Sequence, residues 1–157
     1  MDILLISNED QCRSRMAQAL LESFGRGMRI FTAGIAEGSS VPTVVSEFMT
    51  QKGYEISRKK PAPVGNFTTQ EWGCVISLCR EAEDELNSLN LKTENVKHFC
   101  FDDPLQDISM DEEELQLQLS AVYDDMNRQL YEFYRDTLSE LLMPRCTCGA
   151  NTFCRCE

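Results

Sequence analysis

The stretch that decides the fold is Ile3-Leu4-Leu5-Ile6-Ser7-Asn8-Glu9-Asp10-Gln11-Cys12-Arg13-Ser14. Its four apolar residues predict a buried strand, its six polar residues a tight loop, and its last two residues the first turn of an amphipathic helix. That helix carries apolar residues at helical spacing, at Met16, Ala17, Ala19, Leu20, Leu21 and Phe24. In such an arrangement the loop amides and the positive helix end point at one spot, where Arg13 can bind two oxygens. The stretch therefore predicts a site for an oxyanion.

Further landmarks follow in order along the chain. They are the turn Thr32-Ala33-Gly34, a helix opened by Val41-Pro42 and stopped by Gly53, the segment Tyr54-Glu55-Ile56-Ser57, a buried strand over Cys74 to Cys79, and the loop Asp102-Asp103-Pro104. Together with the first loop, these landmarks resemble the low-molecular-weight protein tyrosine phosphatases and their relatives, the thioredoxin-coupled arsenate reductases, over residues 1–142. The ordered set is much more specific than any single motif.

The resemblance implies an α/β fold. We expect a four-stranded parallel sheet with helices on both faces, the flavodoxin-like three-layer sandwich of this family. Residues 1–143 should form this domain, and residues 144–157 a Cys-rich tail.

The segment from Ser109 to Met143 predicts the terminal helix, because Ser109 and Glu112 have capping-box spacing and apolar residues recur at helical spacing. A straight helix of this length would reach about 50 Å. Either it bends before Asn127 or its end projects and meets a second subunit in a homodimer. We prefer the interpretation in which its apolar face simply packs on the sheet.

The family resemblance places the nucleophilic cysteine at the end of the first strand, where this chain has Ser7. A serine hydroxyl is too weakly acidic to ionise there, and the sequence shows no adjacent base. The family prefers glycine and asparagine in the middle of the loop, where this chain has Glu9 and Asp10. A like charge about 5 Å from a bound anion costs roughly 3 kcal/mol at an effective dielectric of about 20. Glu9 can instead turn outward into water or fold back onto Arg13.

An introduced Cys-to-Ser replacement would explain Ser7 but not the two carboxylates that follow it. We therefore interpret the loop as a natural departure from the catalytic pattern. The predicted phosphate loop comprises Asn8, Glu9, Asp10, Gln11 and Cys12.

Roles carried over from the family fall on particular residues. Asp103 would be the acid that protonates the leaving oxygen, Arg13 the oxyanion clamp, and Ser14 the hydroxyl that steadies a thiolate. Two structural alternatives stay open: Asp103-Pro104 as a plain turn, and Arg13 in a salt bridge with Glu9 or Asp10.

The thiols of the resembling reductases are only partly present. Cys79 matches the second cysteine of their relay, but the third would fall near Leu86. Cys12 lies in the loop, where it cannot form a disulfide with Ser7. Apolar neighbours of Cys74, Cys79 and Cys100 also fit the simpler interpretation of small buried side chains.

Composition indicates one intracellular domain. The formal net charge of -11 argues against nucleic acid and anionic membranes as partners. No stretch is apolar enough to span a membrane, and Met1-Asp2-Ile3 runs directly into the first strand without a signal peptide. We expect a cytoplasmic protein.

The tail adds a second candidate site. Cys146, Cys148, Cys154 and Cys156 form two Cys-x-Cys pairs that suit tetrahedral zinc, or less plausibly thiophilic As(III). Adventitious thiols and disulfides formed during handling are the alternatives.

Three function hypotheses follow. The first is a catalytically impaired phosphatase-like protein, a pseudophosphatase, that binds a protein partner or senses a phosphorylated or oxyanion ligand. The second is an active phosphatase or arsenate reductase in which Ser7 is either an introduced replacement or is replaced in its role by Cys12. The third is a metal- or thiol-handling protein that works through its tail. The loop chemistry requires no cofactor in any of them.

Overall fold

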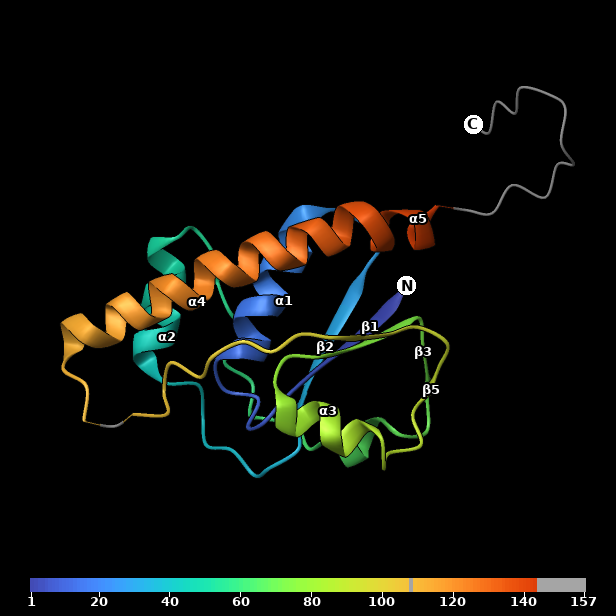
Figure 1. Ribbon diagram of the computed structural model, residues 1–157, viewed down its shortest axis with the longest axis horizontal. Coiled ribbons are helices and arrows are strands. Elements are labelled where there is room, and N and C mark those ends of the chain that lie inside the picture. The colour runs from blue at the N-terminus through green and yellow to red at the C-terminus, as the bar shows by residue number, and fades with distance from the viewer. Residues whose placement is uncertain (108, 144–157) are drawn as a thin grey trace, which may run out of the picture.

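The fold is built on one parallel sheet. The computed structural model describes residues 1–107 and 109–143 (Figure 1). Its sheet contains β1 (Asp2–Ser7), β2 (Arg29–Gly34), β4 (Cys74–Ser77) and β6 (Val96–His98), in the order β2-β1-β4-β6. The four strands are all parallel, with Ile3 opposite both Ile30 and Cys74, and Val75 opposite Val96. A second small sheet pairs β3 (Glu71–Trp72) with β5 (Lys92–Thr93). The predicted four-stranded parallel sheet is confirmed.

The strand β1 lies inside this sheet because its residues are apolar on both faces. Residues Ile3 to Ile6 are all fully buried. A strand covered on both sides shows a continuous apolar run instead of an alternating one, which is the pattern of the opening stretch.

Helices cover the sheet on both faces (Figure 1). On one face lie α1 (Arg13–Phe24), α2 (Thr43–Gln51) and the long α4 (Glu112–Phe133), which pack on Ile3, Leu5, Ile76 and Leu78. On the other face α3 (Arg80–Leu86) and the short 3-10 helix η1 (Val64–Phe67) contribute to a smaller core around Leu4, Ile6, Val75 and Trp72. Gly53, at φ 92°, ends the turn after α2 as the sequence predicts.

The terminal helix differs from its prediction at its start. Asp111, not Ser109, is the N-cap residue, and its carboxylate accepts a hydrogen bond from Glu114 N at 2.9 Å. Ser109 is unavailable because its hydroxyl donates to Asp107 at 2.6 Å. The helix passes position 127 without interruption and continues through a π-helical turn, η2 (Tyr134–Leu138), into α5 (Ser139–Leu142).

The end of that helix packs on the domain. Leu138 is fully buried, and the Tyr134 ring lies 5.8 Å from that of Phe24 on α1. Leu138 is therefore a core residue and Tyr134 is half-buried against α1, whereas Tyr131 on the same helix is 49% exposed.

The strand order determines where a ligand can bind. All four strands run in one direction, so the segments that follow β1, β2, β4 and β6 meet at one edge of the sheet. The chain turns to opposite sides after β1 and β4, which is where open α/β sheets form a crevice. Ser7 ends β1, and Cys79 follows β4 by two residues, so both lie at this edge. The predicted strand over Cys74 to Cys79 is shorter than expected, because Cys79 is the N-cap residue of α3.

Candidate functional site

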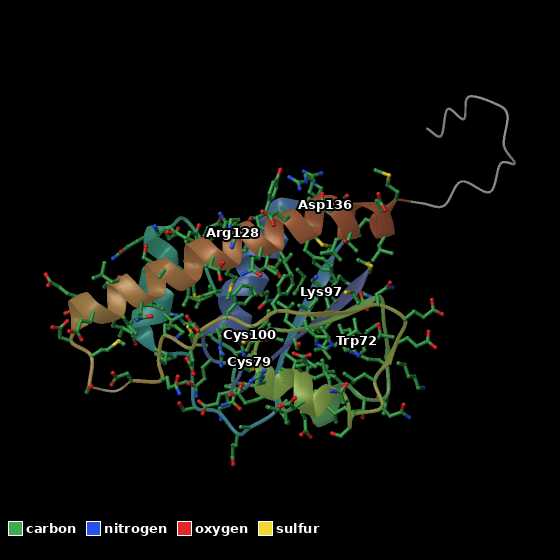
Figure 2. The ribbon with its side chains drawn as sticks, in the orientation of Figure 1. Trp72, Cys79, Lys97, Cys100, Arg128 and Asp136 are labelled. Carbon is green, nitrogen blue, oxygen red and sulfur yellow. The ribbon has the colours of Figure 1, made fainter. Side chains whose placement is uncertain are left out.

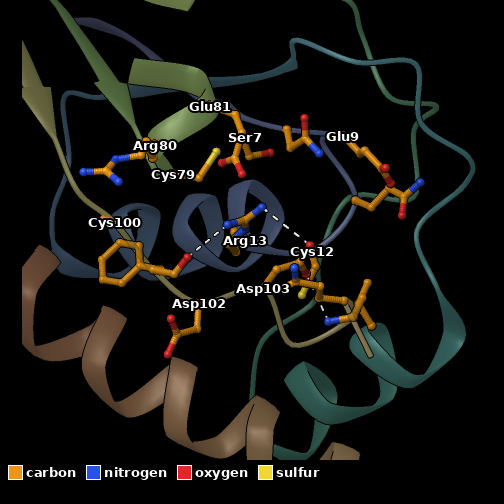
Figure 3. Close-up of a pocket in the computed structure, with 15 residues that line it drawn as sticks. Ser7, Glu9, Cys12, Arg13, Cys79, Arg80, Glu81, Cys100, Asp102 and Asp103 are labelled. Atoms are coloured by element: carbon orange, nitrogen blue, oxygen red, sulfur yellow. Dashed lines mark hydrogen bonds and ion pairs between the residues drawn. The ribbon is translucent and has the colours of Figure 1, made fainter. Parts of the chain in front are cut away.

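A cavity of about 510 Å³ opens at this edge (Figure 3). The first loop supplies one wall, the start of α3 a second, and the segment after β6 a third. The lining residues are Ser7, Asn8, Glu9, Gln11, Cys12, Arg13, Cys79, Arg80, Glu81, Cys100, Phe101, Asp102, Asp103, Leu105 and Gln106. The structure thus brings the predicted loop, Arg13, Asp103 and Cys79 to one place.

The loop is held from inside and outside. Ser7 Oγ accepts a hydrogen bond from Asp10 N at 3.2 Å, which closes the loop on itself. Ser7 O and Asn8 O accept hydrogen bonds from Ile35 N and Ala36 N at 3.1 and 2.8 Å. The strand end and the first loop residues are therefore fixed by backbone contacts that need no ligand.

Asp10 does not obstruct the site, contrary to the expectation from the sequence. It is fully buried at φ 52° and does not line the cavity. Its carboxylate accepts hydrogen bonds from Ser14 Oγ at 2.7 Å, Arg15 Nη2 at 2.9 Å and Ala62 N at 3.2 Å. The left-handed backbone conformation of Asp10 turns its side chain away from the cavity. Arg15, on the other side of the loop, neutralises the charge of this carboxylate.

Arg15 is a structural residue that sequence reasoning missed. It is 3% exposed, and besides Asp10 it donates to the carbonyl oxygens of Ser57, Lys59 and Lys60 at 3.5, 3.1 and 3.4 Å. The Asp10–Arg15 pair thus ties the loop to the segment that runs beside it. The signal was an acid and a base five residues apart, which nothing in the sequence distinguished from a surface pair.

Arg13 faces the cavity and contacts the segment after β6. Its Nη1 donates to Phe101 O at 2.9 Å, and its Nη2 lies 3.6 Å from Asp103 Oδ2. Arg13 does not form the alternative salt bridges with Glu9 and Asp10. Asp10 pairs with Arg15 instead, and Glu9 is exposed. Asp103 also accepts a hydrogen bond from Leu105 N at 3.0 Å. The predicted clamp and the predicted acid are therefore adjacent across the cavity, and Asp103 is held in a turn as well.

Ser14 cannot steady a group at position 7 in this arrangement. Its one hydroxyl hydrogen is donated to Asp10 Oδ1. The role carried over from the family is corrected to a contact that fixes the loop.

Two glutamates also line the cavity. Glu9 is exposed, which agrees with the outward orientation considered from the sequence. Glu81, at the start of α3, lies beside the Cys79 side chain in the close-up (Figure 3). Hydrogen bonds with its own backbone amide and with Cys79, followed by the charges of Arg13 and Arg80, lower the pKa of Glu81 below its ordinary value. The carboxylate that balances Arg13 from the α3 side is therefore Glu81.

The thiols at the cavity differ in accessibility. Cys12 is 4% exposed; burial, and then the charge of Asp103, raise its pKa to about 12, although Arg13 opposes them. Its thiol donates to Met16 Sδ at 3.7 Å. Cys79 is 1% exposed, and burial raises its pKa as well. Cys100 is exposed, so its interpretation as a small buried side chain is wrong. Leu86, at the third relay position, packs against the smaller core.

Within residues 1–107 and 109–143, no group of three or more Cys, His, Asp or Glu side chains is placed to hold a metal ion. The predicted zinc ligands Cys146, Cys148, Cys154 and Cys156 lie outside the described residues. Among the helices that the structure describes, none combines the length and the apolar character that crossing a membrane requires.

The strand, loop, helix and facing acid segment define an α/β protein with a phosphatase-type anion loop. Residues 2–140 match the sequence model of the low molecular weight phosphotyrosine protein phosphatases, and the chain belongs to that family.

Individual relatives agree with this assignment. The chain is 30% identical over 77 residues to a glutaredoxin arsenate reductase from Synechocystis sp., a match that spans 49% of this chain and 59% of that relative. Its fold is similar to the arsenate reductase from Archaeoglobus fulgidus, with a TM-score of 0.61, 18% identity and coverage of 82% and 98% of the two chains. It is also similar to a low molecular weight protein tyrosine phosphatase from Bacillus subtilis, with a TM-score of 0.62, 15% identity and coverage of 87% and 99%.

Proposed function

We propose that this chain is a pseudophosphatase that binds a phosphate-type oxyanion in the loop of residues 7–13. It does not form the phosphocysteine intermediate of a phosphatase with a thiol nucleophile. The observation that carries this proposal is a serine at position 7 inside an otherwise assembled anion cradle. Ser7 Oγ accepts a hydrogen bond from Asp10 N. Among the described residues, no carboxylate or imidazole hydrogen-bonds to this hydroxyl. A serine without a base is a poor nucleophile.

Cys12 is unsuited to replace the missing thiol. Nucleophilic attack needs a thiolate, and a thiol with a pKa of about 12 is almost entirely protonated at neutral pH. Cys12 lines the cavity but is only 4% exposed, and its thiol donates to Met16 Sδ. This supports the pseudophosphatase over an active phosphatase or arsenate reductase that uses Cys12.

The binding part of the cradle is supported by its rigidity. The Asp10–Arg15 pair and the backbone contacts from Ile35 and Ala36 fix the loop before any ligand arrives. A preorganised site loses less conformational entropy on binding. Arg13 lies at the cavity wall, where it can contact a bound oxyanion.

Calorimetric titration with inorganic phosphate and then vanadate tests the proposal. We expect saturable binding that the Arg13→Ala variant loses, while Arg29→Ala, which removes an exposed pair with Asp2 far from the cavity, leaves it unchanged. In parallel, para-nitrophenyl phosphate should not be hydrolysed above the Arg13→Ala background. If the protein does not bind phosphate, the proposed oxyanion binding is wrong. If it hydrolyses para-nitrophenyl phosphate and Arg13→Ala abolishes this turnover, the protein is not a pseudophosphatase.

A second candidate function is stoichiometric phosphoryl transfer to Ser7. One structurally similar protein, a C7S mutant of the YwlE arginine phosphatase with 16% identity and a TM-score of 0.59, contains a phosphorylated active-site serine. In this chain Ser7 lines the same cavity as Arg13 and Asp103. After incubation with acetyl phosphate, this candidate requires the mass of one phosphoryl group on the peptide that contains Ser7. Equal labelling of the Ser7→Ala variant would exclude it.

The Cys-rich tail is a separate proposal that rests on the sequence alone. One equivalent of zinc after mild purification, lost in a Cys146→Ser and Cys148→Ser variant, is the expected result for a metal-binding tail. Equal zinc content in both proteins would reject it.

A further inference from the structure

The charged side chains at the cavity do not balance one another. The cavity is lined by four carboxylates and two guanidinium groups, from Glu9, Glu81, Asp102, Asp103, Arg13 and Arg80. Two formal negative charges are therefore in excess around a loop that presents its amides to an anion. This excess weakens the binding of a free phosphate dianion, because like charges repel one another. A ligand that also carries positive charge outside its phosphate group would be favoured instead.

Glu9 and Asp102 carry the unbalanced charges. Asp103 lies 3.6 Å from Arg13, and Glu81 is the neighbour of Arg80 in the chain. Glu9 and Asp102, by contrast, are exposed, and neither forms an ion pair with any of the described residues. The close-up shows them on opposite sides of Arg13 (Figure 3). Both carboxylates are therefore available to positive charges on either side of a phosphate bound at Arg13.

Arg13 keeps hydrogen-bond donors for that phosphate. Its side chain is only 9% exposed, yet it lines the cavity. Nη1 donates to Phe101 O, whereas Nε and Nη2 donate to no atom of the described residues. A guanidinium group can bind two oxygens of one phosphate through neighbouring N–H groups. The cavity thus combines a buried cation with free donors and a rim of exposed carboxylates.

The cavity has room for more than a phosphate group but offers no aromatic wall. Its volume of about 510 Å³ lies within the range of about 300–1,000 Å³ that is typical of sites for larger ligands. Among the described residues that line it, Phe101 is the one aromatic residue, and it is 3% exposed. A phosphotyrosine ring would find no aromatic face to stack on. A phosphate on a short aliphatic side chain needs no such face.

We infer that the cavity binds a phosphoserine within a basic peptide segment, with the phosphate at Arg13 and flanking lysine or arginine side chains against Glu9 and Asp102. This inference rests on the proposed function, because the phosphate occupies the same loop. Exposed charges act over about 8 Å at physiological ionic strength, so residues on both sides of the phosphoserine can contribute. The formal net charge of -11 adds a longer-range attraction for basic segments.

Calorimetric titration with inorganic phosphate and three phosphopeptides tests the inference. Each peptide has one central phosphoserine, and its flanking residues are lysines, alanines or glutamates. At low ionic strength we expect the lysine peptide to bind about tenfold more tightly than the alanine peptide, and the glutamate peptide to bind more weakly than either. The lysine peptide without its phosphate should bind at least about tenfold more weakly than the phosphorylated one.

A double variant, Glu9→Gln/Asp102→Asn, separates the rim charges from the loop. It should bind inorganic phosphate more tightly and the lysine phosphopeptide more weakly, because the removed charges repel the first ligand and attract the second. A damaged loop would instead weaken both. The control is Glu140→Gln on α5, which should change neither affinity. Leu142 of α5 lies next to Gly27, just before β2 begins, and Figure 2 shows the cavity residues Cys79 and Cys100 away from that end of the molecule.

The outcomes distinguish this inference from the proposed function. Saturable binding of inorganic phosphate together with equal affinities for the three phosphopeptides overturns the inference alone. Binding of neither phosphate nor any peptide removes the proposed function and the inference with it. Equal binding of the lysine peptide with and without its phosphate would show attraction to the acidic surface only, and an undiminished lysine preference in the double variant would show that Glu9 and Asp102 do not provide it. Either result overturns the inference.

Discussion

Replacing Arg15 with methionine tests the buried ion pair behind the anion loop. The substitution keeps an unbranched apolar side chain but removes five hydrogen bonds, to Asp10 O, Asp10 Oδ2 and the carbonyl oxygens of Ser57, Lys59 and Lys60. It leaves the fully buried Asp10 carboxylate without its cation. Removing one partner of a buried pair costs about 3–5 kcal/mol of unfolding free energy. At about 2–4 °C per kcal/mol for a domain of this size, the melting temperature should fall by about 6–20 °C.

The assay is urea unfolding followed by circular dichroism, with Arg29→Ala as the matched control. Arg29 also pairs with an aspartate, at 2.7 Å, but its side chain is 75% exposed, so its loss should cost at most about 1 kcal/mol. Asp10→Asn and the Asp10→Asn/Arg15→Met double variant complete a cycle. We expect the double variant to be more stable than the sum of the single changes predicts, by about 1–3 kcal/mol.

Two results would refute this reasoning. One is a destabilisation of Arg15→Met no larger than that of Arg29→Ala, which would mean that burial adds nothing to the pair. The other is strict additivity in the cycle, which would show that Asp10 and Arg15 stabilise the loop independently. Phosphate titration of Arg15→Met provides a second readout, because a loosened loop should bind the anion more weakly even where the variant remains folded.

The remaining predictions concern a charge at the cavity, the space beside the loop and the protonation of two buried thiols. Glu81→Gln should tighten phosphate binding about threefold to tenfold in calorimetry, because it removes a solvent-screened negative charge near Arg13; unchanged affinity would show that Glu81 does not act on the anion. Gly38→Ala should lower the free energy of unfolding in urea by about 1–3 kcal/mol, because an added Cβ would overlap the backbone carbonyl of Glu9. Gly65→Ala, where a Cβ would meet open space, should be nearly neutral in the same urea assay. Burial raises the pKa of both Cys12 and Cys74 from 9.0 to about 12, so as the pH rises these thiols ionise first in the unfolded chain. The unfolding free energy should therefore fall between pH 9 and 12, by up to about 1.4 kcal/mol per pH unit for each thiol. Replacing both cysteines with alanine should flatten that part of the curve, and an unchanged slope would contradict the assignment.

Much of the fold was predictable because its signals are local. The apolar run before Ser7 indicated an interior parallel strand, and the spacing after Arg13 indicated the helix α1, which begins at that residue. The terminal helix was predicted in type but not in its start, because Ser109 and Asp111 both satisfy capping rules in the sequence. Only the structure shows that the Ser109 hydroxyl is already donated to Asp107.

The site was predictable in position but only partly in its contacts. The sequence placed Arg13 and Asp103 together because the family order implied it, and the structure separates their groups by 3.6 Å. It could not show that Asp10 turns behind the loop, because a positive φ at a non-glycine residue leaves no mark in a single sequence. It also missed Glu81 and Cys100, whose proximity to the loop depends on how α3 and the segment after β6 end at the same edge of the sheet.

The π-helical turn in the last helix corrects the phase of the hydrophobic repeat. Leu130 and Leu138 are both fully buried, yet they stand eight positions apart, whereas two turns of α-helix contain about 7.2 residues. In a regular helix Leu138 would be rotated by about 80° away from the core. A turn closed by i→i+5 bonds holds an extra residue and brings the side chain back to the buried face. Deleting the exposed Asp136 would shorten the spacing from Leu130 to the same leucine to seven positions, about two regular turns. A variant with a regular α-helix one residue shorter should therefore bury that leucine as well.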